Sequence, residues 1–407
     1  MSGKGKEGRV PQIRFAGFTD PWEQRKLGEL FEESDQRSAT EEILSVSVAN
    51  GIYPAAESDR ETNPGASIAN YKVVRVGDIV YNSMRMWQGA VDSSKYNGIV
   101  SPAYVVARPY EKLDSACFGY LLKRPSMLYK YLCDSQGNSK DTQTLKYERF
   151  AEIEAEIPPT VEEQKAISDY MGNLDSLITL HQHKYDKLCE VKKSMLDKMF
   201  PKGGSLYPEI RFAGFTDPWE QRKLGELARR VTRKNTERES DLPLTISAQY
   251  GLIDQRVFFN NQVASKDMSG YFLLRKGEFA YNKSTSSDSP WGAIKRLVKY
   301  DKGCVSTLYI CFELLEADPD YLVTYYETNR WHNAVQLIAA EGARNHGLLN
   351  IAPDDFFETQ LTIPSNRAEQ ARIGSCFMQL DHLITLHQRK LELLRNIKRA
   401  MLDKMFA

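Results

Sequence analysis

The feature that most constrains this chain is a segment of eighteen residues that occurs twice. IRFAGFTDPWEQRKLGEL runs over residues 13–30 and returns unchanged over residues 210–227. We call these two copies the framing segments. A repeat with a period near 200 residues is much longer than a solenoid repeat, so it indicates two duplicated domains. The first copy contains Phe15, Phe18, Trp22 and Leu27, whose apolar side chains predict that the segment packs into a core.

The ends of the two halves repeat as well. LDSLITLHQHK begins at Leu174 and LDHLITLHQRK at Leu380, while MLDKMF begins at Met195 and again at Met401. These later pairs are 206 residues apart and the framing segments are 197 apart, so the second half has nine more residues between its repeated ends. Between those ends, both halves contain alternating or β-branched runs punctuated by glycine, which predict strands and turns.

Each half ends in a predicted long helix. Over residues 160–200 and 366–406, apolar residues recur at alternating steps of four and three, the 3.5-residue period of a coiled coil. About 40 residues give a helix roughly 60 Å long, and the apolar stripe of each helix can pack on that of the other. Four polar residues interrupt the stripe, namely His181, Lys192, His387 and Lys398. We interpret them as polar positions within a helical interface.

These patterns predict a mixed α/β (α+β) chain with an internal repeat, in which two globular domains are joined by two long helices that form a coiled coil. We expect a first domain over 1–157, a first helix over 158–200, a linker over 201–207, a second domain over 208–363 and a second helix over 364–407. Prolines stand just before both helices, where they are tolerated.

The sequence contains no motif that would make the chain an enzyme or a metalloprotein. It has no GxxxxGK[ST] phosphate loop, no GxGxxG turn after a strand, and no HExxH or Cys/His metal set. Its six cysteines are scattered, as expected for free thiols in a reducing cytosol. No apolar stretch is long enough to span a bilayer, so we expect a soluble, cytoplasmic protein.

The loops between the shared strands are polar and partly basic in both halves. Lys plus Arg equals Asp plus Glu at 54 each, so any DNA contact depends on local surfaces. Arg and Lys can pair with guanine, Asn and Gln with adenine, and Ser and Thr can reach base edges or phosphates. The candidates are Asn82, Ser83, Arg85, Gln88, Asn138, Lys140 and Gln143 in the first half, and Lys283, Ser284, Thr285, Ser286, Arg344, Asn345 and His346 in the second. Solvated loops without a ligand are the alternative.

The framing segments and the sequences that lead into the helices carry a family resemblance. IPPTVEEQKAISDYMGNLDSLITLHQ begins at Ile157, and IPSNRAEQARIGSCFMQLDHLITLHQ begins at Ile363. With these segments, nearly the whole chain resembles the specificity subunit of a type I DNA restriction–modification enzyme.

That resemblance implies two target recognition domains, each reading one half of a bipartite, asymmetric site in double-stranded DNA. It also implies that the helices pack antiparallel, set the spacing of the half-sites and dock two modification (methyltransferase) subunits. S-adenosylmethionine would then belong to those partners, and ATP and magnesium to restriction (motor–nuclease) subunits. This chain would be a non-catalytic DNA-binding subunit without a cofactor of its own.

The residues alone leave two other functions open. One is an autonomous enzyme that modifies DNA, which predicts turnover by the purified chain with DNA and a methyl donor or magnesium. The other is a tandem-domain DNA-binding adaptor outside a restriction system, which predicts that no modification subunit co-purifies with the chain.

Overall fold

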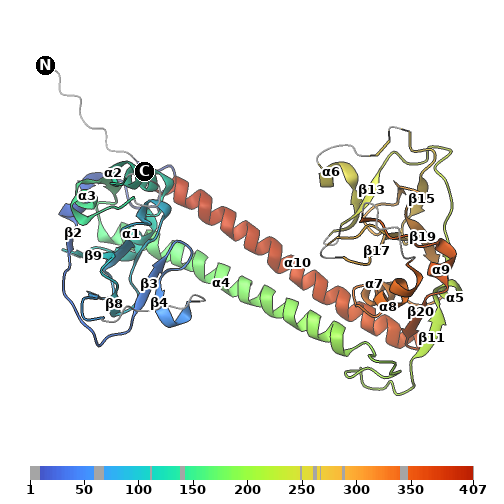
Figure 1. The fold of residues 1–407 in the computed structure, drawn as a ribbon. Helices are drawn as coiled ribbons and strands as arrows, with labels where there is room; N and C mark the ends of the chain where they lie inside the picture. Colours follow the sequence, from blue (N-terminus) through green and yellow to red (C-terminus); the bar gives the residue numbers. More distant parts are fainter. Residues whose placement is uncertain are drawn as a thin grey trace. The chain divides into compact units, whose positions relative to one another are not determined.

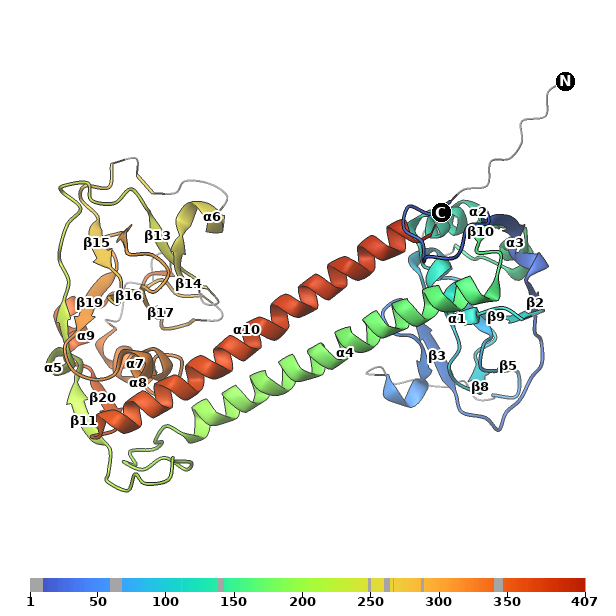
Figure 2. The ribbon, with the colours of Figure 1, turned by 180° about the vertical axis from the view of Figure 1, so that it is seen from behind.

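The computed structural model of the chain describes residues 10–58, 68–110, 112–137, 143–247, 250–259, 264–265, 267–286, 289–339 and 347–406. The chain divides into two compact units. Unit 1 consists of Met1–Gln182 with Arg389–Ala407, and unit 2 consists of His183–Gln388. The two predicted long helices are present as α4 (Val161–Lys198) and α10 (Arg367–Lys404), each 38 residues long, and each unit contains a part of both (Figures 1 and 2).

Unit 1 contains a four-stranded antiparallel sheet with the strand order β2-β9-β6-β7. Its strands are β2 (Phe31–Glu33), β6 (Ile79–Asn82), β7 (Val91–Ser93) and β9 (Tyr104–Pro109). Two further antiparallel pairs join β3 (Leu44–Ser47) to β4 (Gly51–Pro54) and β5 (Lys72–Val74) to β8 (Gly98–Val100). The short helices are η1 (Leu27–Glu29), η2 (Ala55–Glu57), η3 (Met86–Gln88), α1 (Ser115–Leu121), α2 (Pro125–Asp134) and α3 (Tyr147–Glu152).

Unit 2 repeats this plan with the strand order β12-β19-β16-β17. The strands are β12 (Ala228–Arg230), β16 (Phe279–Asn282), β17 (Ala293–Arg296) and β19 (Ile310–Leu314). Its further pairs are β13 (Leu244–Ser247) with β14 (Gly251–Asp254), and β15 (Phe272–Arg275) with β18 (Lys302–Val305). The short helices are α5 (Leu224–Leu227), α6 (Gln255–Phe259), α7 (Pro319–Tyr325), α8 (His332–Ile338) and α9 (Pro353–Phe357). The matching strand orders confirm the predicted duplication.

The two ends of each globular domain pair with each other. In unit 1, β1 (Glu23–Lys26) from the framing segment runs antiparallel to β10 (Glu154–Ile157), which comes just before α4. In unit 2, β11 (Glu220–Lys223) pairs in the same way with β20 (Gln360–Ile363), just before α10. Each domain therefore begins and ends at one two-stranded ladder beside the start of a long helix.

Each unit packs one copy of the repeated segments into its core. Trp22 and Leu27 are buried in the main core of unit 1, and Trp219 and Leu224 in that of unit 2, which confirms the predicted packing of the framing segments. The MLDKMF sequences contribute too: their final Phe residues, Phe406 in unit 1 and Phe200 in unit 2, are buried against these tryptophans.

Polar side chains join the long helices within each unit. In unit 1, Asp175 of α4 bonds Lys398 of α10, and Arg395 donates to Gln182 over 3.0 Å. Residue numbers rise along α4 while their partners fall along α10, so the helix parts in unit 1 are antiparallel. In unit 2, Lys192 Nζ lies 2.5 Å from Asp381 Oδ1. The two lysines that interrupt the apolar stripes are therefore paired with acids of the other helix, as expected for polar interface positions.

Candidate nucleic-acid interface

In unit 1, the first candidate loop leaves the sheet at the end of β6. Asn82 Oδ1 accepts a hydrogen bond from the Met84 amide at 3.0 Å, which forms a local turn. Ser83 Oγ donates to the Ala103 carbonyl at 2.8 Å. Arg85 is exposed, and its guanidinium donates to Gln88 Oε1 at 3.3 Å. The loop backbone is therefore held by its own short polar side chains, while Arg85 extends into solvent.

The second candidate loop of unit 1 lies against the first. The Leu145 amide donates to the Ser83 carbonyl at 2.9 Å, and Gln136 and Thr144 exchange backbone hydrogen bonds at the base of the loop. Gln143 is half-buried and donates to the Gly137 carbonyl at 3.3 Å. The structure therefore brings the two predicted loops together. Asn138 and Lys140 lie outside the described residues.

Unit 2 has the same arrangement with different side chains. Asn282 Oδ1 accepts from the Ser284 amide at 3.0 Å, as Asn82 does from Met84. The Leu349 amide donates to the Lys283 carbonyl at 3.0 Å, and the Thr285 amide donates to the Gly347 carbonyl at 2.6 Å. Ser284 and Ser286 are exposed, and Thr285 is half-exposed. Arg344, Asn345 and His346 lie outside the described residues.

Lys283 differs from the other candidates because its charged end has a backbone partner. Its ammonium donates to the Ile351 carbonyl at 3.1 Å. The side chain is half-buried, and burial lowers the pKa of Lys283. In this structure Lys283 ties the loop to the segment before α9, whereas Arg85, the basic residue of the first loop, is exposed.

Each domain is fixed to the start of its own long helix by a contact that the sequence analysis did not identify. Arg14 donates to both carboxylate oxygens of Glu163 at 2.6 and 2.8 Å, and Trp22 Nε1 donates to Glu163 Oε1 at 3.2 Å. The Glu163 side chain is only 1% exposed. We call this arrangement the framing contact.

The framing contact is repeated in unit 2. Arg211 donates to both oxygens of Glu369 at 2.7 Å, and Trp219 donates to the same carboxylate at 3.4 Å. The glutamine that follows each glutamate is also used: Gln164 and Gln370 accept from the backbone amides of Asp114 and Asp318. The available signal was the Glu-Gln pair shared by VEEQ and RAEQ at the start of two otherwise different helices.

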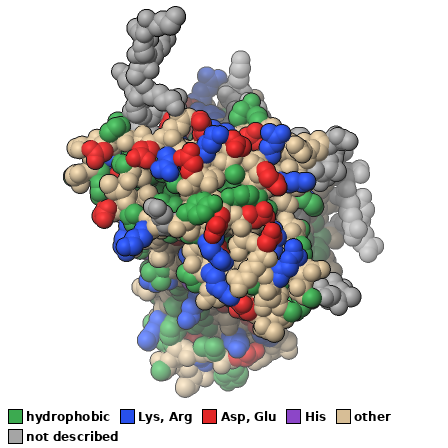
Figure 3. Space-filling view, turned by 90° about the vertical axis from the view of Figure 1, so that its left-hand side faces the viewer, with side chains coloured by type: hydrophobic (Ala, Val, Ile, Leu, Met, Phe, Trp, Pro, Cys, Tyr) green, Lys and Arg blue, Asp and Glu red, His purple; other side chains and the backbone are tan. Residues whose placement is uncertain are grey.

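The charge distribution agrees with recognition by local contacts. On the face of unit 1 shown in Figure 3, acidic and basic side chains are intermingled and no broad basic surface forms. Within the described ranges, no group of three or more His, Cys, Asp or Glu side chains could hold a metal ion. No helix in the described part of the chain is both long and apolar enough to cross a membrane.

Comparison with known proteins identifies a domain in the first half of the chain. Residues 19–190 match the family model of the type I restriction modification DNA specificity domain. A search of curated proteins gave no match. Among solved structures, the chain is similar to the S subunit of a type I restriction-modification system from M. genitalium, with a TM-score of 0.61 and 13% identity over 98% of this chain and 99% of that chain. An HsdS subunit from Thermoanaerobacter tengcongensis also matches, with a TM-score of 0.45 and 14% identity over 95% and 96% of the two chains.

The family match and the internal repeat together cover both halves. The family model covers the first domain and most of α4. The second half repeats the framing segment, the strand order and the framing contact. The likeness to the M. genitalium subunit shows that the fold extends over nearly the full length. Residues 19–190 therefore carry a type I restriction modification DNA specificity domain, which recognises DNA, and the second half of the chain repeats the plan of that domain.

Proposed function

We propose that the two domains, over residues 1–157 and 208–363, read the two halves of a bipartite, asymmetric DNA site. The observation that carries this proposal is the pairing of the candidate loops. Ser83 and Lys283 hold equivalent backbone positions, each bonded to the segment that follows the second loop. The side chains around them differ: Arg85 and Gln88 in unit 1, Thr285 and Ser286 in unit 2. Equivalent backbones with different donors and acceptors suit two different half-sites.

The long helices would dock two modification subunits. Outside the apolar stripe that faces the other helix, each unit exposes two leucines from the repeated LDxLITLHQ sequence. Leu177 and Leu180 of unit 1 are 44% and 47% exposed, and Leu383 and Leu386 of unit 2 are 41% and 49% exposed. Leucines three residues apart lie on one helix face, so each unit offers the same small apolar surface. Two copies of one surface support two copies of one partner.

The remaining chemistry would belong to these partners. We propose that the modification subunits bind S-adenosylmethionine and methylate the DNA, and that restriction subunits supply ATP- and magnesium-dependent cleavage. The expected location is the cytoplasm, where the DNA is. This chain would select the DNA site and bind the other subunits.

Methylome sequencing of a host that expresses the chain with its partner subunits tests the reading proposal. We expect one split motif that disappears when the chain is deleted. Replacing residues 81–89 should change one half of the motif and leave the other half intact, because that loop belongs to unit 1 alone. A change in both halves, or in neither, would contradict the assignment of the loops.

Co-purification tests the docking proposal. Leu180→Asp combined with Leu386→Asp places a charge on each exposed apolar surface and should abolish capture of modification subunits. Thr179→Asp with Thr385→Asp is the matched control, since these exposed residues lie on another face of the same helix turns. Capture that survives the leucine variants would exclude this surface. A wild-type chain that captures no modification subunit would favour the adaptor alternative.

A further inference from the structure

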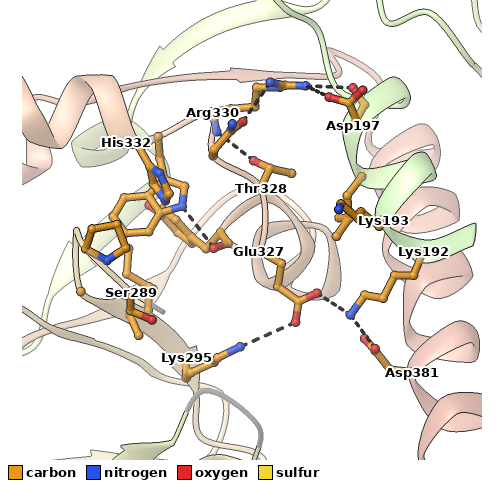
Figure 4. Close-up of a pocket in the computed structure, with 18 of the residues that line it drawn as sticks. Lys192, Lys193, Asp197, Ser289, Lys295, Glu327, Thr328, Arg330, His332 and Asp381 are labelled. Atoms are coloured by element: carbon orange, nitrogen blue, oxygen red, sulfur yellow. Dashed lines mark hydrogen bonds and ion pairs between the residues drawn. The ribbon is translucent and has the colours of Figure 1, made fainter. Parts of the chain in front are cut away.

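In unit 2, a cavity of about 650 Å³ lies between the domain and the parts of α4 and α10 in that unit. Figure 4 shows a chain of charged side chains across it. Lys192 of α4 lies 2.7 Å from Glu327 and 2.5 Å from Asp381 of α10, and Lys295 of β17 lies 3.6 Å from Glu327. Glu327 follows α7, so a domain carboxylate binds the helix lysine directly.

Lys192 is well suited to hold this position. Its side chain is only 17% exposed. Burial lowers the pKa of Lys192, but Glu327 and Asp381 outweigh that effect and raise the pKa above its ordinary value. The ammonium therefore stays charged and ties together one domain residue and one residue of α10.

Unit 1 has a cavity of about 510 Å³ at the corresponding place. There the helix pair is Asp175 of α4 and Lys398 of α10. The domain reaches it through Tyr120 of α1, whose hydroxyl donates to Asp175 at 2.7 Å. Lys123, just after α1, does not bind the helix pair and instead lies 2.5 Å from Asp92 of β7.

The internal repeat relates these residues position by position. Asp175 and Lys398 correspond to Asp381 and Lys192, 206 residues apart, and form the same pair in both units. We call them the helix Lys–Asp pairs. In the domains, residues at equivalent positions carry opposite charges in the two units. Asp92 lies opposite Val80 in the β6–β7 ladder, and Lys295 lies opposite Ala280 in the β16–β17 ladder.

The second exchanged charge follows the helix that faces each cavity. Lys123 and Glu327 each stand nine residues after the aspartate that caps α1 or α7, Asp114 or Asp318. A lysine at this position would repel the helix lysine, whereas a glutamate attracts it. In the first domain, Tyr120 therefore binds the aspartate of the helix pair. In the second domain, Glu327 binds the lysine of the helix pair.

Buried helix residues pack into the core of each domain, and two polar contacts join each domain to its helices at different levels. The first is the framing contact at Glu163 or Glu369, and the second is the helix Lys–Asp pair at Asp175 or Asp381, twelve residues further along the same helix. Twelve helical residues span about 18 Å. A second polar contact at that distance from the framing contact resists rotation of the domain on the helix.

We propose that Tyr120 and Glu327 are positioning residues that fix the angle of each recognition domain on the long helices, and thereby set how strictly the gap between the two half-sites is read. This inference rests on the proposed bipartite function. Any other domain placed on these helices would need an acid that reaches the helix lysine, or a hydroxyl that reaches the helix aspartate.

The test uses the complex of the full chain with its modification subunits and duplexes carrying the motif defined by the methylome. Affinities are measured for the native gap, for gaps one base pair longer and shorter, and for each half-site alone. Glu327→Gln and Tyr120→Phe should each reduce the preference for the native gap at least fivefold, while binding of isolated half-sites changes less than twofold. Both substitutions preserve side-chain shape.

Two controls separate positioning from loss of stability. Glu313→Gln removes a carboxylate bound to Arg229 within the second domain, and Tyr131→Phe removes a hydroxyl bound to the Leu122 carbonyl within the first. Both should leave the gap preference unchanged. An unchanged preference in Glu327→Gln and Tyr120→Phe, or a loss in which half-site binding falls equally, would overturn the inference. A wild-type complex with no gap preference would instead contradict the proposed function itself.

Discussion

Units 1 and 2 close their cores with the same aromatic contact, but the chain reaches that contact by different routes. Phe200 packs edge-on against Trp219 at 5.9 Å between ring centroids, and Phe406 packs in the same way against Trp22 at 6.0 Å. Phe200 and Trp219 are close in sequence and joined by the segment that connects the two halves. Phe406 and Trp22 are separated by nearly the whole chain.

The surroundings of the two phenylalanines differ as well. Phe200 also contacts Tyr321, Tyr325 and Phe377, which form an aromatic cluster in unit 2. Phe406 instead has Arg124 over its ring at 5.6 Å, and that guanidinium donates to the Phe406 carbonyl at 3.2 Å. The same Phe–Trp contact is therefore local in sequence in unit 2 and long-range in unit 1. Unit 1 is complete only when α10 is in place.

Deleting residues 405–407 should produce the largest difference in stability between the two units. Met405 and Phe406 are both buried in the core of unit 1, and losing two such side chains costs roughly 5–8 kcal/mol, comparable with the whole stability of a domain. Hydrogen exchange should show that residues 10–182 lose protection while residues 210–363 keep theirs. Retained protection in unit 1 would show that the α10 end is dispensable.

Removing the framing contact should affect each unit by a similar amount. Glu163→Ala leaves Arg14 without its buried partner and should destabilise unit 1 by about 3–5 kcal/mol, and Glu369→Ala should do the same in unit 2. Urea unfolding followed by hydrogen exchange in each unit measures both. Glu162→Ala is the control, because this exposed position is already Ala368 in the second copy. Clearly unequal losses of stability in the two units would show that the same residues do not make equivalent contacts in both.

The two basic loop residues should separate binding from stability. Arg85→Ala removes an exposed guanidinium and should weaken binding of the unit 1 half-site by about 1–3 kcal/mol, with no change in Tm. Lys283→Met removes the bond to Ile351 and should lower the stability of unit 2 by about 1 kcal/mol while leaving base preference in place. Binding isotherms and thermal melts on the same samples distinguish these outcomes. The reverse pattern would exchange the roles of the two residues.

The smallest expected effect concerns the turn that both loops share. Asn82→Ala and Asn282→Ala each remove one side-chain acceptor for a backbone amide, which should cost about 0.5–1.5 kcal/mol in either unit. For domains of this size, the Tm should fall by a few degrees and equally in both. A loss confined to one variant would mean that only one of the turns depends on its asparagine.

The sequence was sufficient to predict the duplicated plan, the two long helices and the packing of Trp22 and Leu27. These features follow from apolar periodicity and from verbatim repetition, both visible in one chain. The polar positions at Lys192 and Lys398 were also predictable, because they interrupt an otherwise regular stripe. Their partners Asp381 and Asp175 were not, since pairing across two helices depends on their register.

The residues that position the domains escaped prediction for a related reason. Tyr120 and Glu327 both bind a helix Lys–Asp pair, but they differ in chemistry and stand at neighbouring, not identical, positions of the repeat. No residue shared by the two halves therefore indicates this role. The role of Lys283 was hidden as well: a lysine in a polar loop suggests a DNA contact, and only the position of the Ile351 carbonyl shows that its charge is used internally. Whether Arg85 and its neighbours touch bases remains a prediction for the experiments above.

The ladder that closes each domain has an evolutionary consequence. Because β1 pairs with β10, and β11 with β20, the two ends of each domain stay together beside the helix that follows, while loops between them can differ in length. The nine additional residues of the second half illustrate this tolerance. Mutation and recombination can thus explore new binding preferences in the loops inside the ladder while the paired ends of the domain stay in place.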